Sequence, residues 1–180
     1  MFFAPLEGWR HVKVTDRRTM IDFAHCMRDL VDVHFLDAEI IVVVMDNLNT
    51  HKMGALYEAF APAEARRIME KLEELDDIIM VDDGDSVIMT QKLATELGIG
   101  VGISSGANFL GAVIAQNKLG KDKCVVTLFS DDSKKYLSTD LLKKEPIKEG
   151  FLSPSIKLIS VTGHCICKKR IDKGACYGEL

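Results

Sequence analysis

The sequence has no long hydrophobic run, no excess of positive charge and no regularly spaced set of cysteines. A membrane-spanning helix needs roughly 18–20 consecutive apolar residues, so we expect no membrane partner. The net charge of −4 argues against a chain that binds nucleic acid through its bulk charge. Five irregularly spaced cysteines, and no basic segment or long apolar core at the start of the sequence, indicate reduced thiols and a cytoplasmic location.

Of the 180 residues, 47% are hydrophobic and 28% are charged, as in ordinary soluble globular proteins. Apolar residues alternate or form short continuous runs in segments that we predict to be strands: 10–15, 39–46, 77–81, 99–103 and 123–129. They recur at helical spacing, or stand among strong helix formers, in segments that we predict to be helices: 21–33, 55–73 (with a second helix beginning at Pro62), 86–97 and 104–119. This alternation predicts an α/β fold with a mainly parallel sheet.

Three details of this pattern can be checked against a structure. The segment 39–46 is continuously apolar between its charged ends, Glu39 and Asp46, which predicts a central strand that is buried on both faces. Thr19 is placed to cap the first helix. The acidic cluster Asp82, Asp83 and Asp85 predicts a turn and a helix cap, because the spacing of a calcium loop and its distal glutamate are absent.

The segment from Gly98 to Asn108 is the best candidate for a ligand site. It is a short apolar run that ends in small residues and leads directly into a helical pattern. Small residues let a ligand approach the backbone closely, and the first turn of a helix offers free N–H groups. Ser104 and Ser105 are equally typical of a helix cap, so these residues leave both interpretations open.

The same segment resembles a known family. Val101-Gly-Ile-Ser-Ser-Gly-Ala-Asn108 and Val125-Val-Thr-Leu-Phe-Ser-Asp-Asp-Ser-Lys-Lys-Tyr-Leu-Ser-Thr139 resemble, in order and spacing, the C-terminal part of cysteine synthase. That family depends on pyridoxal phosphate and has the tryptophan-synthase-β-like fold. The resemblance covers residues 74–159. It implies β-replacement on an activated serine with sulfide, and therefore a small amino-acid substrate.

The resemblance also implies a cofactor contact. It places Ser104 against the pyridine nitrogen of pyridoxal phosphate, with Ser105 and Gly106 as further cofactor-binding residues. A hydroxyl partner leaves that nitrogen largely uncharged, which suits β-elimination and β-replacement. The Schiff-base lysine, the substrate-carboxylate loop and the phosphate-binding loop have no matching motif here, so we assign no catalytic residue and expect an inactive fragment. Ser133-Lys134-Lys135 replace the usual Gly-Glu-Arg, which indicates a subfamily.

Residues 4–73 resemble a second family, the DDE transposases of insertion sequences, whose catalytic domain is RNase H-like. Gly8-Trp-Arg-His-Val-Lys-Val-Thr-Asp-Arg-Arg-Thr19 and Val42-Val-Val-Met-Asp-Asn-Leu-Asn-Thr-His51 carry this resemblance. It implies that Asp46 is one of three carboxylates that bind Mg²⁺, and that DNA is the partner. The first carboxylate and the last glutamate of that set are missing.

The two resemblances predict two partial domains, 1–73 and 74–159, with an unassigned tail, 160–180. The sequence therefore leaves open a cysteine synthase fragment, a transposase fragment and a non-functional fusion of the two. An incomplete parallel sheet leaves open edges and an apolar face, so we also expect a tendency to form homo-oligomers.

Overall fold

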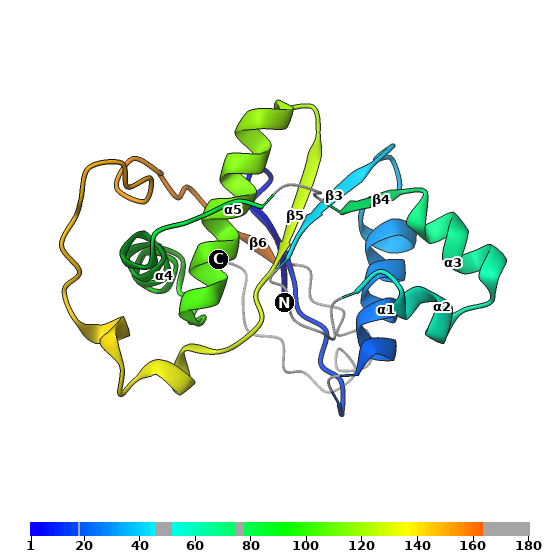
Figure 1. Cartoon of the computed structure of the whole chain (residues 1–180), viewed down its shortest axis with the longest axis horizontal. Helices are drawn as coiled ribbons and strands as arrows, with labels where there is room; N and C mark the ends of the chain where they lie inside the picture. Colours follow the sequence, from blue (N-terminus) through cyan, green and yellow to red (C-terminus); the bar gives the residue numbers. More distant parts are fainter. Residues whose placement is uncertain (18, 46–51, 75–77, 164–180) are drawn as a thin grey trace, which may run out of the picture.

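The computed structural model describes residues 1–17, 19–45, 52–74 and 78–163. Figure 1 shows a central sheet with helices on both sides. On one side lie α1 (Met20–Asp29), α2 (Ala55–Ala59) and α3 (Pro62–Met69), and on the other lie α4 (Asp83–Leu97) and α5 (Ile103–Leu119). No helix in the part of the chain that the structure describes has both the length and the apolar character needed to cross a membrane.

The sheet has six strands in the order β4-β3-β5-β1-β2-β6. Their bounds are β1 Phe2–Ala4, β2 Trp9–His11, β3 Ile41–Val44, β4 Leu72–Glu74, β5 Cys124–Leu128 and β6 Thr162–Gly163. β3 pairs in parallel with β4 and β5, and β2 pairs in parallel with β6, whereas β1 is antiparallel to both of its neighbours. The predicted α/β class and mainly parallel sheet are confirmed.

β3 is the central strand that the sequence predicts. All four of its residues are buried, and they alternate between two clusters. Ile41 and Val43 pack in the cluster that includes residues of α1, α2 and α3, whereas Val42 and Val44 pack with Ala112 and other residues on the α5 side. β-branched side chains suit a strand that is covered on both faces. Because β3 lies between β4 and β5, strands from both sides of residue 73 share one sheet, while a domain boundary at that residue stays a prediction.

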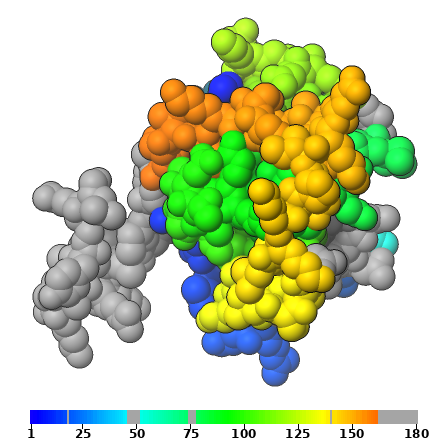
Figure 2. Space-filling model, turned by 90° about the vertical axis from the view of Figure 1, so that its left-hand side faces the viewer, coloured from blue at the N-terminus to red at the C-terminus, as the bar shows by residue number. Residues whose placement is uncertain are grey.

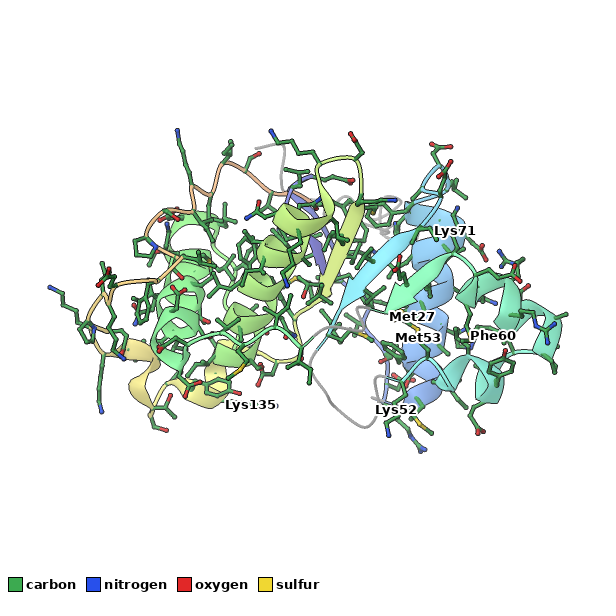
Figure 3. All side chains as sticks on the ribbon, turned by 45° about the horizontal axis from the view of Figure 1, so that its top comes forward. Met27, Lys52, Met53, Phe60, Lys71 and Lys135 are labelled. Atoms are coloured by element: carbon green, nitrogen blue, oxygen red, sulfur yellow. The ribbon has the colours of Figure 1, made fainter. Side chains whose placement is uncertain are left out.

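The helices begin where the sequence predicts, with one exception. Thr19 caps α1 in a reciprocal capping box with Asp22, and Pro62 occupies the first turn of α3. α1 continues as a turn of π-helix, Leu30–His34. Asp82 caps α4 by accepting from the Gly84 N–H at 2.8 Å, so this helix begins three residues earlier than expected. Figure 3 shows Met27 of α1 near Met53 and Phe60, and all three belong to the cluster on this side of the sheet.

Two predicted strands are wrong. Residues 78–81, the described part of the segment 77–81, form no strand, and β4 lies earlier, at Leu72–Glu74. The segment 99–103 makes only an isolated bridge, from Val101 to Asp132. Both edges of β5 are already taken, by β3 and β1, so this segment has no place beside it. Its apolar residues are buried instead against α4 and α5.

The chain that follows β5 wraps around α4, as Figure 2 shows. The buried carboxylate of Asp85 accepts from the backbone N–H groups of Leu152 and Ser153 at 2.7 and 2.9 Å. The Lys92 ammonium donates to the carbonyls of Ser153 and Ile156. These bonds attach a segment with little regular structure to the helix that packs against α5.

Candidate functional site

The candidate site lies at the start of α5, close to the carboxyl end of β5. Open α/β sheets bind their ligands at this end of the strands. Gly102 is the N-cap of α5 and offers no side-chain cap. Ser104 follows in the first turn, is half-buried, and donates from its hydroxyl to Asp131 Oδ1 at 3.4 Å. That distance is at the outer limit of a hydrogen bond, so the Ser104 hydroxyl can exchange this partner for a ligand.

Asp131 joins Ser104 to a third residue. The Tyr136 hydroxyl donates to Asp131 Oδ2 at 2.6 Å. The carboxylate beside Tyr136, together with partial burial, raises the pKa of the phenol above its usual value. Tyr136 therefore stays a neutral donor at neutral pH. The Asp131 carboxylate accepts hydrogen bonds from two hydroxyl groups, those of Ser104 and Tyr136.

The sequence interpretation missed Asp131 and Tyr136 as site residues. Both stand in the segment that carries the cysteine synthase resemblance, but the segment also has the composition of a polar turn. The available signal was position, because Asp131 comes three residues after the carboxyl end of β5 and polar groups at that edge of an α/β sheet face the ligand crevice.

Ser105 and Gly106 are buried. A Cβ on Gly106 would lie 2.2 Å from Thr90 Oγ1 and 2.3 Å from the Ser86 carbonyl, so this glycine lets α4 and α5 pack closely. The backbone N–H groups of Ser105 and Gly106 donate to the Gly102 carbonyl at 3.0 and 3.3 Å. Their roles as cofactor contacts stay predictions, and of the three predicted residues only Ser104 has a partly exposed side chain.

A small cavity of about 140 Å³ lies at the same end of β5. Its walls include Lys13, Thr19 and Cys26 on one side and Leu128 and Ser130 on the other. Burial raises the pKa of the Cys26 thiol, which leaves it neutral. The cavity includes residues of α1, whereas Ser104 stands on α5, on the other side of the sheet.

Asp46, the predicted metal ligand, lies outside the described residues. Within the described ranges, no group of three or more histidine, cysteine, aspartate or glutamate side chains is arranged to hold a metal ion.

Comparison with known proteins supports one of the two resemblances. No family model matches the chain. The probable cysteine synthase of Bacillus subtilis is 46% identical over 66 residues, which are 37% of this chain and 21% of that protein. Cysteine synthase B of Campylobacter jejuni is 38% identical over 92 residues, which are 51% of this chain and 28% of that protein. About half of the chain is homologous to the pyridoxal-phosphate-dependent cysteine synthase family.

A solved structure extends the similarity. The hydrogen sulfide-producing enzyme of Fusobacterium nucleatum superposes with a TM-score of 0.60 and 35% sequence identity, covering 79% of this chain and 53% of that one. Residues 74–180 alone cannot supply 79% of the chain, so the superposition also includes part of residues 1–73. Nothing in the comparisons supports the transposase resemblance, a fusion, or the Mg²⁺ and DNA that they implied.

Proposed function

We propose that this chain forms the ring-nitrogen side of a pyridoxal-phosphate site of the cysteine synthase type. The observation that carries the proposal is the half-buried hydroxyl of Ser104, held loosely at 3.4 Å by Asp131 in the first turn of α5. The homology to cysteine synthases and the match to a hydrogen sulfide-producing enzyme support it.

The residues at this position fit the ring end of the cofactor. A hydroxyl group both donates and accepts hydrogen bonds, so Ser104 Oγ can pair with a pyridine nitrogen in either protonation state. Gly102, two residues before Ser104, lets Asp131 and Tyr136 lie close against the first turn of α5. When bound, the cofactor would supply an electron sink for β-elimination and β-replacement on an amino acid.

The chain's own contribution is to bind and orient. Ser104 would hold the ring nitrogen, Asp131 would direct the Ser104 hydroxyl, and close packing at Gly106 would fix α5 against α4. The sequence predicts that neither a Schiff-base lysine nor a phosphate-binding loop is present, so the chain would bind the cofactor without a covalent bond and would need other groups to complete the reaction.

Binding of pyridoxine 5′-phosphate tests this proposal. This compound has the ring and the phosphate of the cofactor but no aldehyde, so it cannot react with surface lysines. We expect saturable binding by calorimetry, which Ser104→Ala weakens about 5- to 10-fold through loss of one hydrogen bond. The matched control is Ser138→Ala, which removes an exposed hydroxyl from the segment after β5. Equal affinities of the wild type and Ser104→Ala would contradict the proposal.

The covalent anchor needs its own test. We expect that pyridoxal phosphate, after borohydride reduction, labels lysines without preference, as measured by peptide mass spectrometry. Reduction onto a single lysine at stoichiometric cofactor would show that the chain does contain the anchor, and the expectation of inactivity would then be wrong.

A further inference from the structure

A second cavity lies along α5, away from Ser104. Its volume is about 340 Å³, and its walls come from the turn between β1 and β2, the last residue of α4, the later turns of α5 and residues 156–160. Gln116, one of the lining residues, stands twelve positions after Ser104 on the same helix. A rise of about 1.5 Å per residue separates the two by roughly 18 Å, so this cavity is distinct from the candidate cofactor site.

Apolar side chains form most of the wall. Phe3 and Phe109 are the most deeply buried of the lining residues and form the floor, with ring centroids 5.6 Å apart. Around them stand four half-buried apolar side chains that pack against the core on one side: Leu97, Val113, Ile156 and Leu158. An apolar cavity of this size is typical of small-molecule sites.

Gln116 adds one buried hydrogen-bond acceptor. The residue is only 8% exposed, and its amide nitrogen donates to the carbonyls of Gly120 and Lys123 at 2.7 and 2.9 Å. Neither of these partners lines the cavity. Both amide hydrogens are thereby used, which also fixes the orientation of the amide. None of the described residues donates to Gln116 Oε1, so this oxygen is left to accept from an occupant.

The charges at this cavity lie in solvent. Among the described residues that line it, Glu7 and Lys157 are the charged ones, and both are exposed. A charged group that moved past them onto the apolar floor would lose its water and find no buried partner of opposite charge, which is costly. The occupant that fits is therefore apolar, uncharged and able to donate one hydrogen bond.

Gly8 holds one side of the cavity together. Its φ is 60°, and a Cβ there would lie 2.7 Å from the carbonyl oxygen of Ser160. Glycine is the residue that tolerates both the left-handed backbone and this close approach. β2 and β6, which flank the contact, pair in parallel. This wall is thus part of the sheet itself, and the cavity exists before any ligand binds.

We propose that this cavity binds a small, uncharged aromatic molecule that carries one hydroxyl or amine donor, such as a phenol. The ring would pack against Phe3 and Phe109 in offset or edge-to-face contact, and the donor would reach Gln116 Oε1. The site does not depend on the proposed cofactor function, so failure of either proposal leaves the other standing.

p-Cresol and 4-fluorotoluene test the site in the unaltered chain, because the two have nearly the same shape and only p-cresol has a donor. In an NMR titration of ¹³C-labelled methyl groups, we expect p-cresol to shift Val113 and Leu158 saturably, with a Kd of about 0.1–1 mM for so small a ligand. Absence of a saturable shift at these methyl groups would overturn the proposal. Shifts of the same groups on dilution of the chain alone would show that a second copy covers the cavity, and would also overturn it.

Gln116→Met tests the hydrogen bond. The Kd of 4-fluorotoluene divided by that of p-cresol should be about 5- to 10-fold higher in the wild type than in this variant, as expected for one hydrogen bond. The variant also loses the bonds to Gly120 and Lys123, but that loss affects both ligands and cancels in the ratio. An unchanged ratio would overturn the proposal, because the cavity would then select for apolar shape alone.

Val113→Trp tests the location, since the larger side chain takes up the space that the ligand needs. We expect p-cresol to bind about tenfold more weakly or worse. The matched control is Ile114→Trp, a half-buried neighbour on α5 that does not line the cavity, and it should bind as the wild type does. Equal affinities of the two variants would place p-cresol elsewhere and overturn the proposal. Should Val113→Trp fail to fold, as judged by circular dichroism, the methyl shifts of the wild type and the ratio in Gln116→Met still decide.

Discussion

The hydroxyl of Thr127 lies 3.0 Å from the carbonyl oxygen of Val44, a residue 83 positions earlier in the chain. Thr127 is completely buried in β5, and its hydroxyl is also within 3.3 Å of the Asn108 carbonyl on α5. The bond joins a strand from the first 73 residues to one from the cysteine synthase-like part. The two halves of the sequence therefore share buried polar contacts as well as a sheet.

Thr127→Val should destabilise the protein by about 1–3 kcal/mol, because the variant keeps the shape of the side chain but leaves buried carbonyl groups without this donor. The matched control is Thr95→Val, which removes an exposed hydroxyl on α4 and should change the free energy of unfolding by less than about 0.5 kcal/mol. Urea denaturation measures both. Equal stabilities of the two variants would show that the Thr127 bond contributes nothing.

Unfolding of the whole chain should occur in one cooperative transition. Trp9, the single tryptophan, lies in β2 and reports one part of the sheet by its fluorescence, while far-ultraviolet circular dichroism reports the helices. Since β3 lies between β4 and β5, we expect the two probes to give the same midpoint in urea. Two separated transitions would instead indicate that the segments on either side of residue 73 fold independently, as a fusion of unrelated fragments would.

The sequence predicted those strands and helices whose residue types are determined by local burial or by local helix capping. Residues 40–45 are all apolar because β3 is covered on both faces, and Thr19 and Pro62 mark helix starts through local chemistry. The sequence-based prediction was wrong where pairing with a distant strand decides whether a segment joins the sheet. β1 has only three residues, too few to show a period, yet it occupies the edge of β5 that the apolar segment 99–103 would have needed.

The candidate site divides in the same way. Ser104 was predicted because small residues before a helix are visible in the chain itself. Asp131 and Tyr136 were not, because their importance depends on a bridge that brings residues 101 and 132 together. A turn composition at residues 130–136 describes their local structure correctly and does not indicate what they face.

Close packing of α4 and α5 at Gly106 should make this position intolerant of any side chain. Gly106→Ala would place a Cβ 2.3 Å from the Ser86 carbonyl, which cannot move without shifting α4, so we expect a loss of about 1–3 kcal/mol or more. Gly111→Ala in the same helix is the matched control. Its Cβ would meet Val44 Cγ1 at an ordinary 3.5 Å, and alanine is the better helix former by about 0.5–1 kcal/mol.

Thermal or urea unfolding of these two alanine variants should therefore change stability in opposite directions. A Gly106→Ala protein as stable as Gly111→Ala would mean that α4 and α5 are not packed as closely as the structure shows.

The capping box of α1 should make stability depend on pH at the acidic end. The hydroxyl and backbone N–H of Thr19 hold the pKa of Asp22 below its ordinary value. A lowered pKa in the folded state gives stability that is present above the unfolded value of about 4 and is lost as the pH falls through the folded pKa. The difference in urea midpoint between wild type and Asp22→Asn should therefore be present at neutral pH and shrink below about pH 4. A difference that stays constant down to the acid limit would exclude this role.

Cys124, at the start of β5, should react slowly for a partly exposed thiol. Burial, reinforced by the charge of Glu7, raises its pKa to about 12. Only the thiolate is nucleophilic, so at about pH 8 roughly one molecule in ten thousand is reactive, against a substantial fraction of an ordinary thiol with a pKa of about 8.5. In a variant whose other four cysteines are serine, alkylation by iodoacetamide should be about a thousand-fold slower than in the same protein in urea, and should speed up about tenfold for each pH unit. A rate at pH 8 equal to that of the unfolded chain would mean that β5 begins in water rather than against the core.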